Sequence, residues 1–435
     1  MNEIGVFICN YNKADYVVEC VEKVLNQTLK NLDIYVVDNA STDESVSKLR
    51  ERFGDTVTVI VNAENIGGSG GFNTGIKKAE ELGYQYIMLL DNDAMLEEHA
   101  IERLFEYLEA HKDVGFCGAE TLNMHYPERY QDFGGRLDFD AFYMRGIMAG
   151  SGKLEIPVAM EADYVASCAL LCRMEAVRAA GGMPEENFIY WDDVEMCTRC
   201  RMAGYKVVVL STAKAYHDIS GAGPQNLFLA YYANRNRYRF YTKYLSKERL
   251  DAFYDSVTHE LFSKLYGCPP KKLTATMMTR WNAWDDFAHG ITGKAKDGRI
   301  GVFTSENSPL RQRLAEWKTV FIHMPQHEAA DYQALNTVLN YFSRINHNIA
   351  VTVALSSEGY DLDSFDALFR LCGHVTKVSE NILPWYYIDG YKNWIGSERD
   401  YLYFTAFDKA LEQFRTMYRP YFEERVKELR DDAEF

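Results

Sequence analysis

The feature that most restricts the fold is an alternation of short apolar runs with amphipathic helical patterns over the first 120 residues. The apolar runs have the length and composition of buried strands, and the segments between them have helical spacing. Such alternation predicts an α/β fold with a doubly wound, parallel sheet. The predicted strands are Ile4 to Cys9, Ile34 to Val37, Val57 to Val61, Tyr86 to Leu90 and Val114 to Cys117.

Polar side chains follow the predicted strands at the points where the strands end. In a parallel sheet the carboxyl ends of the strands lie along one edge, and ligands bind beyond that edge. The sequence therefore predicts a ligand cleft there. Its candidate residues are Asn10 and Asn12 after the first strand, Asp38 and Asn39 after the second, Asn62 and Asn65 after the third, and Asp91 to Asp93 after the fourth.

The chain is acidic, with a formal net charge of -16 and a pI near 5.2. It lacks the excess of lysine and arginine that binds a phosphate backbone, so nucleic acid is not an expected partner. No run approaches the roughly 20 apolar residues that cross a bilayer, and nothing near Met1 resembles an export signal. The nine cysteines suit reduced thiols, so the expected location is the cytoplasm.

At 435 residues the chain exceeds what one hydrophobic core usually supports. We expect a catalytic domain over residues 1–245, a helical linker region over 246–298 and a carboxy-terminal accessory lobe over 299–435. The last part is expected to combine helices with the strands Ile300 to Thr304, Val320 to His323 and Ile349 to Ala354, and to end in an amphipathic helix that Pro420 interrupts. This helix could form a partner interface, which leaves a homo-oligomer open.

The triplet Asp91-Asn92-Asp93 places two carboxylates directly after an apolar strand, over the expected cleft. Carboxylate oxygens suit Mg²⁺ or Mn²⁺, which commonly bridge protein carboxylates to substrate phosphates. An acidic pair after a strand is equally common as the cap of a helix. The triplet alone therefore leaves both interpretations open.

A second acidic group occurs in Trp191-Asp192-Asp193-Val194-Glu195, before a helix expected to begin near Met196. Helix capping explains one of these acids but not all three. A carboxylate fixed by neighbouring aromatic packing can take a proton from an incoming hydroxyl, which makes Asp193 the candidate base. His217 follows 24 residues later, and taken alone it is more often a core or surface histidine than a metal ligand.

The stretch from Asn65 to Phe72 is a glycine-rich loop that enters a helix. Glycines allow the backbone to approach a diphosphate closely and to present amide groups to it. The stretch lacks the spacing of a dinucleotide fingerprint and the Lys-Ser/Thr of a P-loop. A flexible turn is an equally good interpretation of the loop by itself.

The order of these motifs along the chain resembles that of glycosyltransferase family 2. The motifs are the strand-end Asp38, the Asn65 to Phe72 loop, the Asp91 triplet, Phe188 to Glu195 and His217. The similarity covers about residues 1 to 245 and is especially marked toward bacterial galactofuranosyltransferases, although Asn92 stands where those enzymes have a third aspartate. The resemblance implies an inverting enzyme with a GT-A fold. It also implies a metal held by Asp91, Asp93 and His217, the base Asp193, and donor-binding residues Asn10, Asp38, Asn65, Gly68, Asp91, Asn92, Trp191 and Asp192.

The resemblance further implies a Mn²⁺- or Mg²⁺-dependent transfer from a nucleotide-sugar donor to a glycan or lipid-linked glycan. UDP-galactofuranose is the expected donor, and dTDP-rhamnose is the alternative. A stripe of Arg235, Arg239 and Lys243 on a predicted helix could approach lipid headgroups at the inner membrane face or could be a solvated or salt-bridged face. A non-catalytic nucleotide-sugar binding module and a nucleotidyltransferase are the other functional classes considered.

Overall fold

The computed structural model describes residues 3–147, 157–218, 226–266, 275–301, 309–324, 329–372, 385–389, 394–395 and 407–431. The chain divides into two compact units, and each is described by itself. The first comprises Met1–Ser246, Ala283–Arg299 and Glu428–Phe435, and the second comprises Lys247–Asn282 and Ile300–Lys427.

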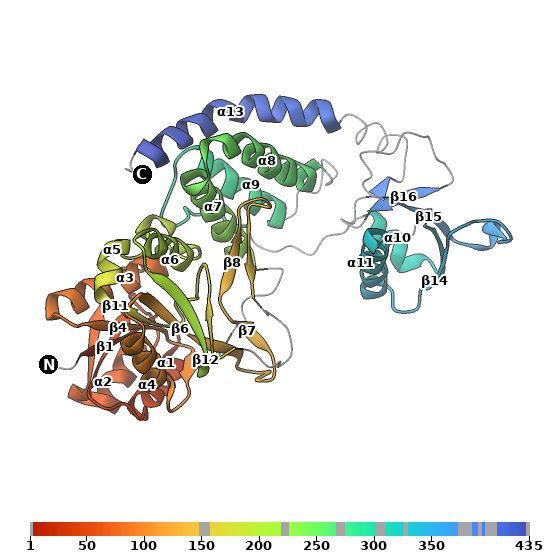
Figure 1. Cartoon of the computed structure of the whole chain (residues 1–435). Coiled ribbons are helices and arrows are strands. Elements are labelled where there is room, and N and C mark those ends of the chain that lie inside the picture. Colours follow the sequence, from red (N-terminus) through yellow and green to blue (C-terminus); the bar gives the residue numbers. More distant parts are fainter. Residues whose placement is uncertain are drawn as a thin grey trace. The chain divides into compact units, whose positions relative to one another are not determined.

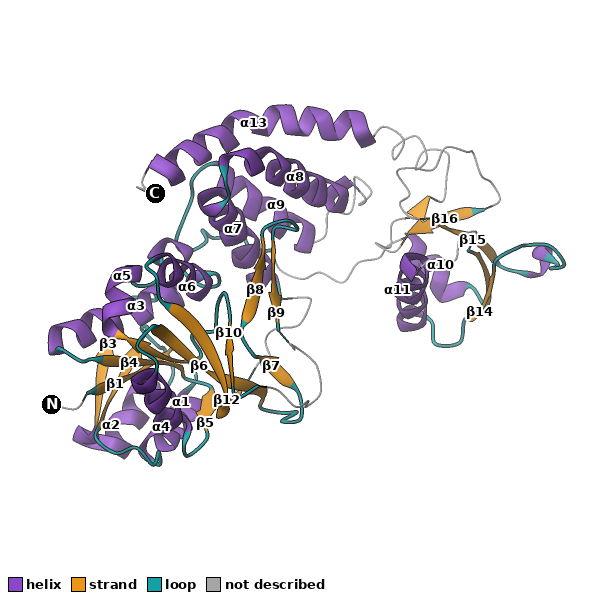
Figure 2. Cartoon of the chain, in the orientation of Figure 1, coloured by secondary structure: helices purple, strands orange, loops and turns teal. Residues whose placement is uncertain are grey.

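The first unit contains a large sheet whose amino-terminal half is parallel, as predicted (Figures 1 and 2). The register pairs Asn10 with Asp38 and Cys9 with Asp91, so the carboxyl ends of three strands lie side by side. The four parallel strands are β1 (Ile4–Asn10), β2 (Leu32–Asp38), β3 (Val57–Val61) and β4 (Tyr86–Asp91). The strands β1 and β4 are almost completely buried, which explains their unbroken apolar runs.

The other half of this sheet is mixed, which differs from the simple parallel arrangement expected. The strand β11 (Ala169–Arg173) runs antiparallel between β4 and β6 (Val114–Asn123). The strand β12 (Lys206–His217) lies parallel to β6 and extends to His217. The shorter strands β5 (Ala94–Leu96) and β10 (Ala159–Glu161) pair with β12, and β7 (Tyr130–Asp132) pairs with β6, while β8 (Gly135–Asp138) and β9 (Tyr143–Gly146) form a separate hairpin.

Helices pack on both faces of the sheet (Figure 2). The helix α6 begins at Asp192 rather than near Met196, because its acidic residues form the first helical turn, where carboxylates interact favourably with the helix dipole. The Asn226 side chain caps α7 by accepting a hydrogen bond from the Leu229 amide at 3.0 Å. The helices are α1 (Ala14–Leu25), α2 (Ser45–Phe53), α3 (Gly67–Leu82), α4 (Ala100–Ala110), α5 (Met174–Ala180), α6 (Asp192–Met202) and α7 (Leu227–Tyr244).

The second unit contains a smaller sheet of order β14-β13-β15-β16-β17, of which the first four are parallel. The expected strands Val320 to His323 and Ile349 to Ala354 are present, whereas most of Ile300 to Thr304 lies outside the described residues. The strands are β13 (Thr319–His323), β14 (Ala350–Ala354), β15 (Ala367–Cys372), β16 (Tyr386–Asp389) and β17 (Trp394–Ile395).

The carboxy-terminal helix α13 (Phe407–Asp431) continues through Pro420, so the expected interruption is wrong. Its aromatic residues pack in the second unit, where Phe422 contacts Tyr254 with ring centroids 4.8 Å apart. This packing stabilises the helix although proline lacks an amide donor. The remaining helices are α8 (Leu250–Tyr266), α9 (Ala275–Ala288), α10 (Pro309–Glu316) and α11 (Ala329–Ile345).

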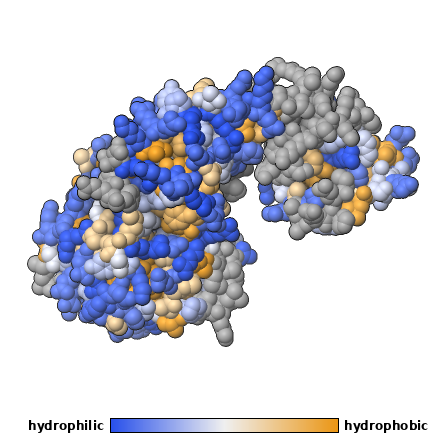
Figure 3. All heavy atoms as spheres, turned by 45° about the horizontal axis from the view of Figure 1, so that its top comes forward, coloured by the Kyte–Doolittle hydropathy of each residue, from blue (hydrophilic) through white to orange (hydrophobic). Residues whose placement is uncertain are grey.

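The described helices were compared with the length and hydropathy of a membrane span. None of them is long and apolar enough to cross a bilayer. The face of the molecule drawn in Figure 3 is mostly hydrophilic, with smaller apolar areas between charged residues.

Candidate active site

The carboxyl ends of β1, β2 and β4 are joined by a buried network of polar side chains. The Asn10 amide donates to Asp38 at 2.8 Å, and Asn92 donates to the Asn10 carbonyl at 2.7 Å. Ser41 donates to the same Asp38 carboxylate through its amide at 2.9 Å and its hydroxyl at 2.7 Å. Asp38 is fully buried. It therefore holds the strand ends together, and its expected contact with the donor base stays a prediction.

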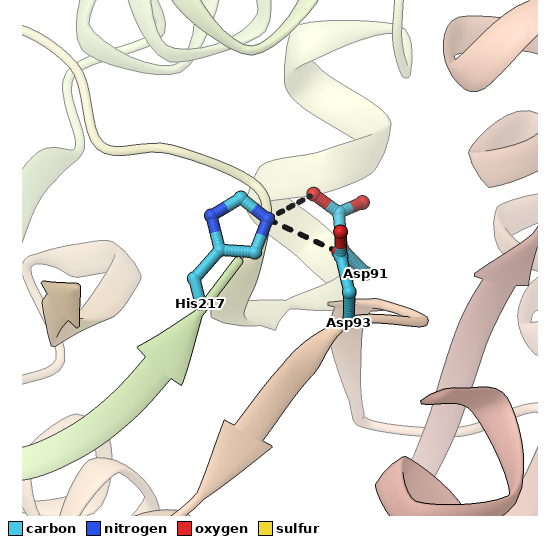
Figure 4. A group of neighbouring side chains, drawn as sticks. All are labelled: Asp91, Asp93 and His217. Carbon is cyan, nitrogen blue, oxygen red and sulfur yellow. Dashed lines mark hydrogen bonds and ion pairs between the residues drawn. The ribbon is translucent and has the colours of Figure 1, made fainter. Parts of the chain in front are cut away.

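Beside this network, Asp91, Asp93 and His217 converge from separate elements (Figure 4). The His217 Nε2 atom lies 3.1 Å from an Asp93 oxygen and 3.7 Å from an Asp91 oxygen. The antiparallel pairing of β5 with β12 places His217 opposite Ala94, next to Asp93. Among the described residues, these three side chains form the group of acidic, histidine or cysteine residues whose ligand atoms lie close enough together to hold one metal ion.

The charges of this group are strongly coupled. Burial raises the pKa of Asp91, although the His217 charge opposes the shift. Burial also disfavours ionised Asp93, but hydrogen bonds from His217 and Lys13 outweigh it and lower the pKa of Asp93. Burial disfavours charged His217, but its hydrogen bond to Asp93 and the charges of the two carboxylates outweigh burial and raise the pKa of His217. The group thus attracts positive charge, as a cation site must.

The second ring nitrogen of His217 faces Gln131 on β7, with Nδ1 at 2.5 Å from Nε2 of the glutamine. The Gln131 Oε1 atom is buried without a hydrogen-bond partner. A 180° rotation of the amide would turn this oxygen toward the imidazole and let His217 Nδ1–H donate to it. Nε2 would then be free to bind a metal, the usual arrangement of a ligating histidine. The residues present therefore fit a divalent cation.

Lys13, which the sequence interpretation did not include in the site, forms an ion pair with Asp93. Its Nζ also lies 5.3 Å from the centre of the Tyr16 ring. Lys13 follows the polar residues at the end of β1, and a cation at a predicted ligand edge was the signal that could have identified it. It is the kind of group that contacts a phosphate.

The glycine-rich segment forms the start of α3 and packs tightly against neighbouring parts of the protein, whereas a flexible or phosphate-binding loop was expected. A side chain at Gly67 would clash with the carbonyl of Phe188, and one at Gly71 would clash with Cys9 and Asn39. These two glycines therefore permit packing against neighbouring elements rather than close approach to a phosphate. Asn65 accepts a hydrogen bond from the Gly67 amide at 2.9 Å, and Gly68 is the half-buried glycine of this turn, with Ile189 its nearest neighbour.

The glycine-rich segment is linked to the start of α6. The Ser69 hydroxyl donates to buried Asp192 at 2.8 Å. Trp191 is also buried and packs against Phe240 and Tyr241, with ring centroids 5.2 and 5.8 Å away. The structure therefore gives Trp191 and Asp192 a packing and linking role, and their expected contact with the donor stays a prediction.

The candidate base Asp193 is half-buried in the first turn of α6. Its carboxylate accepts hydrogen bonds from the amides of Val194 at 2.7 Å and Ser167 at 3.4 Å. Burial, and after it the Asp192 charge, raises the pKa of Asp193 to about 8. A carboxylate with a raised pKa is a stronger proton acceptor when ionised, which suits a general base.

The two acidic groups are linked through the backbone, because the Asp193 carboxylate accepts from the Ser167 amide at 3.4 Å and the Cys168 carbonyl accepts from the Asp91 amide at 3.1 Å. Asp132 on β7 lies close enough to influence the ionisation of Asp193, and His217 in turn influences Asp132. Likewise Asp192 influences Asp91. Asp132 was missed by the sequence interpretation, because its segment showed no helical or strand pattern. Burial raises the pKa of Asp132 to about 6.

The stripe of Arg235, Arg239 and Lys243 points into the protein. Arg235 is fully buried and donates to the carbonyl of Gly293 at 2.8 Å. Arg239 pairs with Glu186 at 3.3 Å and Lys243 with Glu195 at 2.9 Å. The expected approach of this stripe to lipid headgroups is therefore corrected, because internal partners satisfy its charges.

Residues 5–131 match the model of the family "Glycosyl transferase family 2". A chondroitin synthase of Escherichia coli is 32% identical over 121 residues, which cover 28% of this chain and 17% of that protein. The glycosyltransferase GlyG of Streptococcus pneumoniae is 36% identical over 109 residues, which cover 24% of this chain and 35% of that protein. The match thus spans about a third or less of either relative.

Among solved structures, the mannosyltransferase PcManGT from Pyrobaculum calidifontis, in complex with GDP-Man and Mn²⁺, has a TM-score of 0.41 and 16% identity. The alignment covers 54% of this chain and 62% of that structure. The special closeness to galactofuranosyltransferases or rhamnosyltransferases stays a prediction. Residues 5–131, which include the strand ends and both metal-site aspartates, are therefore similar to glycosyl transferase family 2.

Proposed function

We propose that this chain is an inverting, metal-dependent glycosyltransferase that moves a sugar from a nucleotide-diphosphate donor to a hydroxyl group. The observation that carries the proposal is the convergence of Asp91, Asp93 and His217 at the edge of the sheet. The family match includes the two aspartates. Asp193 and His217 lie beyond the matched residues. The pairing of β5 with β12 brings His217 next to Asp93. The Asp193 carboxylate accepts a hydrogen bond from the Ser167 amide, and the carbonyl of the following residue, Cys168, accepts one from the Asp91 amide.

In this proposal the three metal-site residues hold Mn²⁺ or Mg²⁺ on the donor diphosphate. The bound cation would neutralise the charge that develops on the departing nucleoside diphosphate. Lys13, beside Asp93, adds a second positive charge near the leaving group. The buried network of Asn10, Asp38 and Asn92 keeps the strand ends in register around the donor.

Asp193 takes the proton from the attacking acceptor hydroxyl in the proposed mechanism. Its oxygens are fixed by two backbone amides, yet the residue is only half-buried, so an acceptor can reach it. One base and no covalent nucleophile imply a single displacement, which inverts the configuration at the anomeric carbon. Asn65, Gly68, Trp191 and Asp192 shape the donor side of the site in this proposal.

The proposed donor is UDP-galactofuranose, with dTDP-rhamnose as the alternative, and the proposed acceptor is a lipid-linked or growing surface polysaccharide at the cytoplasmic face of the membrane. The proposal is tested by a donor-hydrolysis screen with Mn²⁺ or Mg²⁺. The panel contains UDP-galactofuranose, UDP-galactopyranose, UDP-glucose, UDP-N-acetylglucosamine and dTDP-rhamnose. Release of nucleotide from one donor would identify the sugar.

The matched variants are Asp91→Ala in the metal site and Asp55→Ala, which removes an exposed carboxylate elsewhere in the first unit. We expect Asp91→Ala to lower metal-dependent hydrolysis by on the order of 10²-fold or more, because the leaving group loses its charge stabilisation. Asp55→Ala should keep the wild-type rate. A wild-type protein that binds a donor with the metal but neither hydrolyses nor transfers it would instead favour a nucleotide-sugar binding module.

A further inference from the structure

The segment before α6 has an unusual backbone. Phe188, Tyr190 and Trp191 have φ values of 67°, 64° and 67°, in the left-handed region that residues with side chains rarely adopt. Three such residues within four positions must be stabilised by their surroundings. Because Trp191 immediately precedes the first turn of α6, this conformation determines where Asp193 is placed.

The surroundings that stabilise it lie on α7. Asn236 is fully buried, and its Nδ2 group donates to the carbonyls of Asn187, Ile189 and Tyr190 at 3.0, 2.8 and 2.9 Å. The two N–H groups of one side-chain amide are thus shared among three carbonyls within four residues of this backbone. Without this donor the part-buried carbonyls of Ile189 and Tyr190 would lose this hydrogen-bond partner, which is costly away from solvent.

The neighbouring Arg235 extends the same contact. Its guanidinium group donates to the carbonyls of Asn187 at 3.0 Å and Gly293 at 2.8 Å. Its Nε donates to Oδ1 of Asn236 at 3.1 Å, which fixes the orientation of the Asn236 amide and leaves Nδ2 toward the carbonyls. The orientation of Asn236 therefore follows from the network.

We propose that Asn236 is a positioning residue for the transfer reaction: it holds residues 187–191 in the left-handed conformation that places Asp193 for proton abstraction. The inference rests on the proposed function, because it takes Asp193 as the base. Asn236 acts through the backbone, and its distance in sequence from the acidic residues explains why no motif includes it. A small displacement of a reacting carboxylate is sufficient to lower a rate greatly.

The test uses Asn236→Asp, which keeps the size of the side chain but replaces its donor with a second acceptor. The matched control is Asn234→Asp on the same helix, where the side chain donates only to the Ala230 carbonyl of its own helix at 2.6 Å. Asn236→Ser is a milder second variant that keeps a hydroxyl donor. Three quantities are measured on the full chain: kcat for transfer, Mn²⁺ affinity, and hydrogen exchange of the amides of residues 188–193.

We expect Asn236→Asp to lower kcat by about 10²-fold, to accelerate exchange in residues 188–193 and to leave Mn²⁺ affinity unchanged, because the metal-site residues lie on other elements. Asn236→Ser should lower kcat less, and Asn234→Asp should match wild type. Wild-type kcat and exchange in both Asn236 variants would overturn the inference. Loss of folding in both would also overturn it, because Asn236 would then be required for stability rather than for positioning.

The result separates this inference from the proposed function. If the wild type transfers sugar and the Asn236 variants transfer equally well, the inference fails and the function stands. If the wild type transfers no sugar with any donor, while exchange in residues 188–193 accelerates in Asn236→Asp, the proposed function fails. In that case Asn236 still holds the segment, but for a different activity.

Discussion

Both units of this protein contain a parallel sheet, but the two sheets differ in what lies at the carboxyl ends of their strands. In the first unit these ends carry Asn10, Asp38 and Asp91, which are polar, bonded to neighbours and adjacent to His217. In the second unit β13 ends at His323 and β14 at Ala354, which the register pairs. The second edge also carries Asp389, at the end of β16. Among the described residues, however, the group of side chains close enough to hold a metal ion lies at the first edge.

His323 illustrates the difference. Its Nε2 atom lies 3.1 Å from the Leu355 carbonyl, so a backbone group already occupies the nitrogen that could bind a ligand. His217, in contrast, faces two carboxylates and has a side-chain amide behind it. The comparison shows that a parallel sheet positions a site but does not create one, because the chemistry depends on the residues that follow each strand.

The largest expected effect on the rate of transfer concerns Asp193, the proposed base, which belongs to the first unit. Because its pKa is raised to about 8, the carboxylate is mostly protonated below that pH and cannot accept a proton. We therefore expect kcat for transfer to rise by about tenfold per pH unit on the acid side and to level off as the pH passes about 8. Measured kcat between mildly acidic and mildly alkaline pH checks this.

The matched variant for that experiment is Asp193→Asn, which cannot ionise but preserves the size of the side chain. It should lose on the order of 10³-fold in kcat, within the range for removal of a general base, and the remaining rate should lack the acid limb. Mn²⁺ binding should persist, because the metal-site residues are unchanged. An Asp193→Asn protein with the wild-type rate and pH profile would remove Asp193 from the mechanism.

An intermediate effect is expected at Gln131, the residue behind His217. Gln131→Met removes the hydrogen bond to the imidazole, so the ring is no longer held with Nε2 toward the aspartates. Loss of such an outer partner typically weakens metal binding by about 10- to 100-fold. Mn²⁺ affinity measured by calorimetry tests this, with the exposed Gln85→Met as control. Equal affinities in both variants would show that His217 needs no orienting partner.

The sequence was sufficient to predict the strands that build the first sheet edge. The predicted run Tyr86 to Leu90 is a buried strand that ends one residue later, at Asp91, because a continuous apolar run is a local signal. The sequence did not predict that β11 lies antiparallel between β4 and β6. Strand neighbours are determined by long-range packing, which a single sequence does not encode in any local pattern.

The candidate site was predicted only in part, because some of its residues have a local sequence signal and others do not. Asp91, Asp93 and Asp193 follow strands or begin helices and were therefore recognisable. Gln131 and Asp132 lie in a short strand without a clear pattern, and Asn236 lies within a helix where an asparagine has no local signature. The start of α6 was predicted four residues too late. Trp191, which precedes the helix, has a left-handed backbone conformation, and the residue preferences of helix caps do not predict a tryptophan there.

The smallest expected effect on activity comes from a substitution at the carboxyl edge of the second sheet. This substitution tests whether the two sheet edges really differ in function. His323→Ala removes an imidazole that contacts the Leu355 carbonyl and whose ring centre lies 5.9 Å from that of Trp385. Among the described residues, His323 is not part of the group that could hold a metal ion. We expect metal-dependent donor hydrolysis and Mn²⁺ affinity to equal those of wild type, whereas His217→Ala should weaken both. If His323→Ala lowered Mn²⁺ affinity as much as His217→Ala, the second edge would also be a ligand site, and the contrast drawn between the two sheets would have to be abandoned.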